Sequence, residues 1–73
     1  MTRLTHTEYE ALERAIVDGT RVAIRRPGRR EHIVIPLRLT LRDGREIIEA
    51  RNSTTGHAME IDLEDVEHLE VVR

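Results

Sequence analysis

The chain has 73 residues, one tyrosine, no other aromatic residue and no cysteine, and its formal net charge is −2. A chain of this length forms one small domain, expected over residues 1–73, and without cysteine it forms neither disulfides nor thiolate metal sites. No apolar run is long enough for a membrane span or a secretory signal, so we expect a cytoplasmic protein with no membrane partner.

The first expected element is a helix over about residues 8–18. Four apolar residues recur at helical spacing and form one stripe: Tyr9, Leu12, Ala15 and Ile16. Thr7 is the expected N-cap, because Glu10 follows three residues later as in a capping box. Gly19 supplies the left-handed residue that commonly ends a helix. So short a helix is not stable alone, and its apolar stripe must pack on the rest of the domain.

Five strands are expected after the helix, over about residues 20–26, 32–42, 45–51, 58–63 and 68–72. In the longest one, apolar residues alternate without a break, which predicts an inward face of Ile33, Ile35, Leu37, Leu39 and Leu41. This pattern leaves Val34 and Pro36 on the outer face, where the proline indicates an edge or a bend.

The dipeptide Asp43-Gly44 predicts a two-residue hairpin turn between the second and third strands. The register that follows pairs three sets of residues: Leu39 with Ile48, Leu37 with Ala50, and Arg38 with Glu49. A single helical turn is expected near residues 64–67, before the last strand. The predicted fold is therefore mainly β with one N-terminal α-helix, a five-stranded SH3/Sm-like small β-barrel.

Several short segments are typical of one bacterial family: Ala15-Ile16, Arg21-Val22-Ala23-Ile24, Ile33-Val34-Ile35-Pro36-Leu37, Asp43-Gly44-Arg45, Ala50 and Ile61-Asp62-Leu63-Glu64-Asp65-Val66. On these segments the chain resembles the WYL domain, an SH3/Sm-like module often attached to transcription regulators and defence proteins. Residues 46–48, Glu-Ile-Ile, stand where the family has its namesake Trp-Tyr-Leu. Asp62 and Asp65 stand where it usually carries arginines for a nucleic-acid or nucleotide ligand. The resemblance implies the barrel and a regulatory binding role.

A second resemblance covers two segments, Tyr9-Glu10-Ala11-Leu12-Glu13-Arg14-Ala15 and Leu39-Thr40-Leu41-Arg42-Asp43-Gly44. They are similar to the opening helix and first hairpin of the small protein inhibitors of the Rho termination factor. Those inhibitors cover a nucleic-acid site with an acidic surface. This resemblance implies an acidic protein-interaction factor, with candidate contact residues Glu60, Asp62, Glu64, Asp65 and Glu67.

The strongest candidate site is a group of arginines around the turn Pro27-Gly28: Arg25, Arg26, Arg29 and Arg30. Guanidinium groups bind phosphate oxygens in pairs, so this loop is expected to bind an anionic ligand or a nucleic-acid backbone, with Arg38 and Arg51 as further contacts. The alternative is a solvated loop that pairs with the acidic stretch and has no ligand.

No motif of a nucleophilic, phosphate-binding or metal-dependent enzyme is present, and the four histidines lack the paired spacing of metal ligands. We therefore expect a protein that is not an enzyme, with no catalytic residue, metal or cofactor. Three roles stay open: a regulatory module that binds an anionic ligand, an acidic factor that binds a protein, and a self-assembling structural barrel. Self-association is expected because Val34 and Ile47 would expose apolar surface.

Overall fold

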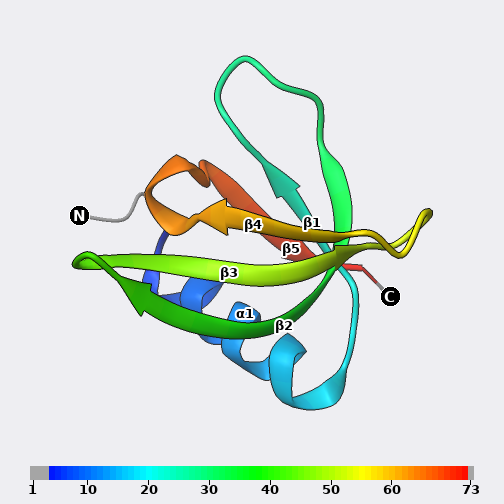
Figure 1. The fold of residues 1–73 in the computed structure, drawn as a ribbon, viewed down its shortest axis with the longest axis horizontal. Helices are drawn as coiled ribbons and strands as arrows, with labels where there is room; N and C mark the ends of the chain where they lie inside the picture. The colour runs from blue at the N-terminus through cyan, green and yellow to red at the C-terminus, as the bar shows by residue number, and fades with distance from the viewer. Residues whose placement is uncertain (1–3, 73) are drawn as a thin grey trace.

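The computed structural model describes residues 4–72 and contains one helix and five antiparallel strands (Figure 1). The elements follow in this order: α1 His6–Asp18, β1 Val22–Arg25, β2 His32–Arg42, β3 Arg45–Asn52, β4 Ala58–Asp62, the 3-10 turn η1 Leu63–Asp65, and β5 His68–Val71. The predicted order of a helix followed by five strands is confirmed. No helix within residues 4–72 has the length and apolar character needed to cross a membrane.

Helix α1 begins two residues earlier than predicted, and its N-cap is Thr5 rather than Thr7. The Glu8 backbone N–H donates to Thr5 Oγ1 at 3.1 Å, and the Thr5 N–H donates to Glu8 Oε1 at 3.0 Å, which completes a capping box. Thr5 and Thr7 are each followed by a glutamate three residues later, so this pattern alone does not distinguish them. Leu4 is buried in the core directly before Thr5, and this tertiary contact sets where the helix starts.

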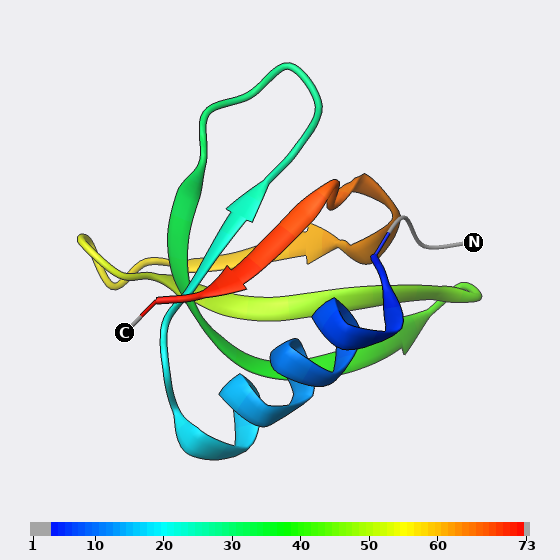
Figure 2. The same ribbon diagram turned by 180° about the vertical axis from the view of Figure 1, so that it is seen from behind.

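The strands form one sheet in the order β4-β3-β2-β1-β5, and each neighbouring pair is antiparallel. Strands β4 and β5 are its two edges, so the hydrogen-bonded sheet is open between them and a closed barrel stays a prediction. Helix α1 lies against one side of the curved sheet, where it contacts β5 and β2 (Figure 2). The loop between β1 and β2 extends away from the sheet at the end opposite α1 (Figures 1 and 2).

The predicted inward face of β2 is wrong for its first half. Val34 and Pro36 are buried there, while Leu37, at 42% exposure, is the extra residue of a β-bulge between Pro36 and Arg38. A bulge changes which residues face the core, so even-numbered residues point inward before it and Leu39 does so after it. Leu41 is 74% exposed because it lies near the hairpin tip, past the core.

The hairpin between β2 and β3 has the predicted turn. Asp43 and Gly44 both have positive φ, 52° and 77°, as a tight two-residue turn requires. The predicted pairs Leu39 with Ile48 and Arg38 with Glu49 are confirmed, but Ala50 pairs with Pro36 instead of Leu37. The bulge is again the reason, since it removes Leu37 from the register.

The core lies between α1 and the concave face of the sheet and contains no buried polar side chain among residues 4–72. Every element contributes to it, and its members are Leu4, Leu12, Ala15, Val22, Ile24, Val34, Ile48, Ala50, Ile61, Leu63, Val66 and Leu69. Met59 is half-buried and packs against this core. The core thus joins the helix, both sheet edges and η1 in one unit, and this unit holds the β1–β2 loop in place.

Candidate functional site

The loop over residues 26–31 joins β1 to β2, and we call it the arginine loop because it contains Arg26, Arg29 and Arg30. Pro27 and Gly28 form its turn, which is closed by a hydrogen bond from the Arg29 N–H to the Arg26 carbonyl at 3.1 Å. Gly28 has a φ of 69°, a conformation that favours glycine. The turn holds Arg26 and Arg29 at opposite ends of four residues, and Arg29 and Arg30 are exposed.

The arginine loop has no neutralising partner in the part of the chain that the structure describes. No carboxylate of residues 4–72 forms an ion pair with Arg26, Arg29 or Arg30. Arg25, the fourth predicted member, differs because its Nε lies 3.6 Å from Glu67 Oε1. The arginine loop therefore carries positive charge without an ion pair among residues 4–72, whereas the charge of Arg25 on β1 is offset by Glu67.

Two buried nitrogen atoms at the base of the arginine loop have no hydrogen-bond partner among residues 4–72: Arg26 Nε and His32 Nδ1. His32 begins β2 and lies opposite Ile24, two residues before Arg26, so both nitrogens belong to the same end of the hairpin. Buried polar atoms in proteins nearly always have a partner, and the exceptions often mark functional positions. The base of the loop therefore has unused hydrogen-bonding capacity.

A hollow of about 190 Å³ lies beside the loop and is lined by Arg26, Pro27, Arg29 and Asp65. Asp65 reaches this place because β5 pairs with β1, with His68 opposite Arg25, and because the Glu67 N–H donates to the Arg25 carbonyl at 2.8 Å. These contacts position η1 next to the start of the loop. One residue of the acidic stretch, Asp65, thus lines the same hollow as the arginine loop.

The other predicted arginines lie on strands and do not line this hollow. Arg38 Nε is 3.2 Å from Glu49 Oε1 across the β2–β3 pair. Arg51 donates from Nη1 to the Gly56 carbonyl at 3.2 Å, in the loop after β3. The structure therefore does not bring Arg38 and Arg51 together with the arginine loop.

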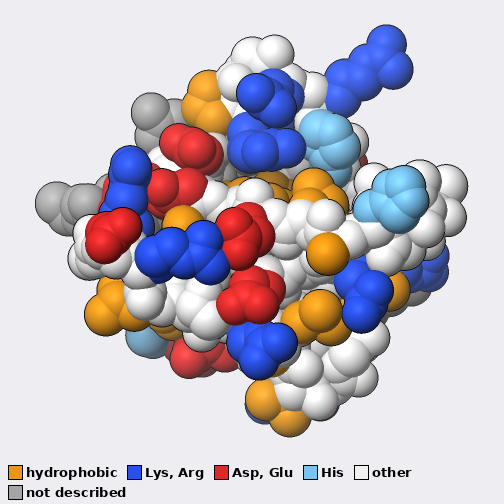
Figure 3. Space-filling view, viewed as in Figure 1, with side chains coloured by type: hydrophobic (Ala, Val, Ile, Leu, Met, Phe, Trp, Pro, Cys, Tyr) orange, Lys and Arg blue, Asp and Glu red, His pale blue; other side chains and the backbone are white. Residues whose placement is uncertain are grey.

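The acidic stretch after β3 is largely neutralised by arginines from neighbouring strands. Arg42 donates to both carboxylate oxygens of Glu60, at 3.0 and 2.8 Å, and this guanidinium holds the pKa of Glu60 below its ordinary value. Asp62 pairs with Arg45 at 3.0 Å and accepts the Glu64 N–H at 2.9 Å. Figure 3 shows acidic and basic side chains side by side over this face, whereas basic ones gather at the top, where the loop lies.

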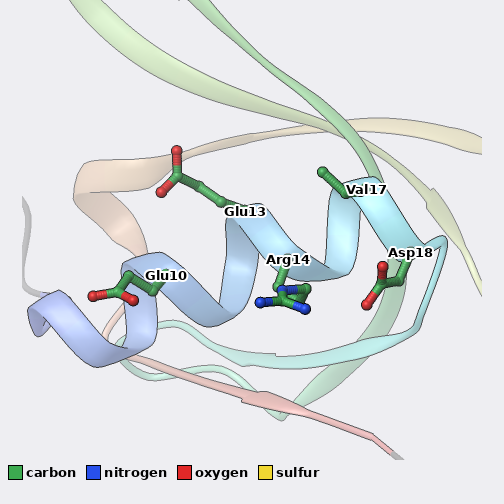
Figure 4. Close-up of a pocket in the computed structure, with 5 residues that line it drawn as sticks. All are labelled: Glu10, Glu13, Arg14, Val17 and Asp18. Carbon is green, nitrogen blue, oxygen red and sulfur yellow. The ribbon is translucent and has the colours of Figure 1, made fainter.

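Other hollows occur in the described part of the molecule. One is the outer surface of α1, where five side chains from a single helix spread along it without converging on one point (Figure 4): Glu10, Glu13, Arg14, Val17 and Asp18. A second, between α1 and the end of β5, includes Ala11, Val71 and Val72. Another spans β2, β3 and β4 and includes Leu37, Ala58 and Met59. The α1 hollow also has charges without ion pairs, but they are of both signs and come from one helix, whereas the arginine-loop hollow joins two arginines of a loop to a carboxylate from a distant segment.

The described part of the chain contains no metal-binding cluster. Among residues 4–72, no three His, Asp or Glu side chains lie close enough together to hold a metal ion. His6 instead contacts Glu10 on α1, and His68 contacts Glu8. A comparison of the sequence with protein-family models and with curated proteins finds no match.

Two contacts between distant segments were not predictable from residue patterns. The Tyr9 hydroxyl donates to Glu46 Oε2 at 2.7 Å, and the Leu69 N–H donates to Glu8 Oε2 at 3.1 Å. Both link α1 to the sheet, and neither has a short-range sequence signal. The position of Asp65 beside the arginine loop belongs to the same class, because it depends on the pairing of β1 with β5.

Proposed function

We propose that this chain is a non-enzymatic regulatory module that binds an anionic ligand or a nucleic-acid backbone through the arginine loop. The observation that carries the proposal is the division among the arginines. On the strands, Arg38, Arg42 and Arg45 form ion pairs with carboxylates, whereas Arg26, Arg29 and Arg30 have none among residues 4–72. Arg14, Arg21 and Arg51 also lack an ion pair there but are dispersed along the chain, so only the arginine loop gathers three such arginines in one segment. Planar guanidinium groups with free N–H donors bind phosphate or carboxylate oxygens in pairs.

The proposed architecture is a small SH3/Sm-type barrel that resembles the WYL domain. The strand order β5-β1-β2-β3-β4, the bulge in β2 and the 3-10 turn before β5 support it. In this arrangement the β1–β2 loop lies at an open end of the barrel, and loops at such ends commonly carry binding residues.

The acidic protein-interaction role has weaker support. Three of its five candidate residues, Glu60, Asp62 and Glu67, form ion pairs with Arg42, Arg45 and Arg25. A partner that docked on them would first have to displace these arginines.

Self-assembly is a second candidate role, and it rests on the open edges of the sheet. Strand β4 pairs only with β3, and β5 pairs only with β1, so each presents one unpaired side of backbone. The hollow that extends from Leu37 on β2 across β3 to Ala58 and Met59 on β4 adds apolar surface next to this edge. A second copy could bind there by continuing the sheet.

The test of the main proposal measures binding of the full chain to a fluorescently labelled single strand and to a duplex, by anisotropy, over a series of salt concentrations. Replacing Arg29 and Arg30 with glutamine should weaken binding by roughly tenfold and reduce the salt dependence by about two phosphate contacts. Arg26 is left intact because its Nε is buried. The matched control replaces Arg14 and Arg21, two exposed arginines outside the loop, and removes the same charge. Equal effects of the two double variants would contradict the proposal.

A further inference from the structure

Asp65 differs from its neighbours Asp62 and Glu67 because its oxygens have no partner among residues 4–72. Asp62 caps η1 and pairs with Arg45, and Glu67 pairs with Arg25, but no hydrogen bond or ion pair involves the Asp65 side chain. Asp65 is exposed and lines the hollow together with Arg26 and Arg29. The hollow therefore presents hydrogen-bond donors and an unused acceptor at the same time.

The Asp65 carboxylate forms no ion pair with Arg26 or Arg29, so it does not simply neutralise the arginine loop. If Asp65 served only to offset the loop, its carboxylate would lie in ion-pair contact with Arg26 or Arg29, as Glu67 does with Arg25. Instead the two signs of charge face one recess of about 190 Å³ without touching. A bare anion in this recess would be attracted by the arginines and repelled by Asp65. A ligand with an anionic group next to an N–H donor would satisfy both walls.

The net charge of the residues around the recess also indicates which anionic group fits there. Its lining carries two arginines and one aspartate, which leaves a formal charge of +1. Arg30 and Glu31 follow in the loop and cancel each other formally. A phosphate ester fits this excess and matches the paired N–H groups of a guanidinium. A nucleotide carries a phosphate and, through its sugar, a base whose amino group is a donor that aspartate accepts, as it does from N4 of cytosine.

On this basis we infer that Asp65 is a specificity-determining residue, which selects nucleotides whose base carries an exocyclic amino group while the arginine loop holds the phosphate. The inference rests on the proposed function and adds the identity of the group that Asp65 contacts. Pro27 contributes an apolar wall, and the unpartnered nitrogens of Arg26 and His32 provide further hydrogen-bonding capacity at the base of the loop. The nucleotide can be free or part of a single strand, since both present the same groups.

The test compares ligands that differ only at the amino position. Cytidine and uridine monophosphates share ribose and phosphate, but C4 carries an amino donor in one and a carbonyl acceptor in the other. Affinities for both are measured by calorimetry with the full chain, and affinities for short oligo-dC and oligo-dT strands are measured in parallel. We expect a preference of roughly fivefold or more for the cytosine member of each pair, the lower range for one side chain–base contact. If the monophosphates bind more tightly than the strands, the ligand is a free nucleotide. If the strands bind more tightly, it is a nucleotide within a single strand.

The variant Asp65→Asn should reduce this preference to about twofold or less, because the amide presents donors as well as an acceptor. The same variant should bind inorganic phosphate more tightly, since the repelling carboxylate is gone. Asp43→Asn, in the exposed β2–β3 turn, is the matched control and should leave the preference unchanged.

The outcomes separate this inference from the proposed function. Equal affinity for the cytosine and uracil ligands, or a preference that persists in Asp65→Asn, overturns the role of Asp65. If Arg29→Gln/Arg30→Gln still weakens binding of every strand in that case, the proposed function stands. If no nucleotide or strand binds the native chain, both are overturned.

Discussion

The carboxylate of Glu8, in the first turn of α1, accepts the backbone N–H of Leu69 in β5, with Oε2 and N 3.1 Å apart. The same side chain accepts the Thr5 N–H through Oε1, and its Oε2 lies 2.9 Å from His68 Nδ1. One glutamate thus caps the helix and attaches it to an edge strand 61 residues away. Its side chain is only 16% exposed, so water replaces these contacts poorly.

Replacing Glu8 with glutamine is expected to destabilise the fold by about 1–3 kcal/mol at pH 7, the range for a capping interaction combined with a charge-assisted hydrogen bond. Urea denaturation measures the change. Glu13→Gln, on the exposed side of the same helix, removes the same charge and should cost little. Equal costs for the two variants would show that the link to β5 is not significant.

The stability that Glu8 contributes should depend on pH in the acid range. The hydrogen bond from the Thr5 N–H, with those from Leu69 N–H and the Thr5 hydroxyl, outweighs desolvation and holds the pKa of Glu8 below its ordinary value. A carboxyl group with a depressed folded-state pKa stabilises the fold above its unfolded pKa and loses that contribution as the pH falls through the folded value. Denaturation of the native chain and of Glu8→Gln should therefore converge at low pH. A constant difference down to about pH 2 would contradict this expectation.

Tyr9 provides a spectroscopic test of the contact between α1 and β3. The hydrogen bond to Glu46, assisted by burial, raises the pKa of Tyr9 to about 12. The chain has no other tyrosine and no tryptophan, so ultraviolet absorption follows this one hydroxyl. The stability from the contact is complete below the ordinary tyrosine pKa of about 10 and is lost as the pH rises through about 12.

In Glu46→Gln the tyrosine should titrate closer to its ordinary value, because the carboxylate acceptor and its charge are both gone. Glu10→Gln, which changes an exposed residue next to Tyr9 in sequence, serves as control. An unchanged titration in Glu46→Gln would mean that the hydroxyl does not contact Glu46 in solution.

Leu12 connects α1 to the core, and its side chain is completely buried. Replacing it with alanine should cost about 2–5 kcal/mol, because the change removes apolar contact and leaves a cavity. Val17, 82% exposed on the same helix, is the control, and Val17→Ala should change stability by less than about 0.5 kcal/mol. A loss below that limit for Leu12→Ala, measured by chemical denaturation, would show that the helix is not docked.

Self-association is expected at the β4 edge, although one of the two residues that motivated it is placed differently. Val34 is buried opposite Val22, so only Ile47, which is half-buried, contributes from that pair. The open β4 edge and the exposed Leu37, which lies on β2 at the far end of the hollow that reaches β4, now carry the prediction. Sedimentation velocity over a concentration series should show a mass above the monomer, and Leu37→Lys should shift the chain toward the monomer. Val17→Lys, at another exposed apolar residue, should not. A monomer at every concentration would remove this prediction.

The sequence by itself determined the features that depend on short-range stereochemistry. Gly19 ends α1 with a φ of 72°, and the Asp43-Gly44 turn sets the register of the β2–β3 hairpin up to Arg38. Such features follow from the backbone conformations that two or three neighbouring residues allow. The arginines around Pro27-Gly28 were recognisable for the same reason, since the turn and its charges lie within six residues of chain.

Only the tertiary structure decided which residues face the core in β2 and which charges stay unpaired. Residues 33–37 are all apolar, so an alternating pattern fits either face, and the bulge at Leu37 selects one through packing. The ion pairs of the acidic stretch and the position of Asp65 beside the arginine loop require β1 to pair with β5 and β3 with β4. These pairings join segments far apart in the chain, and their free energy comes from burying one common core, which no local pattern encodes.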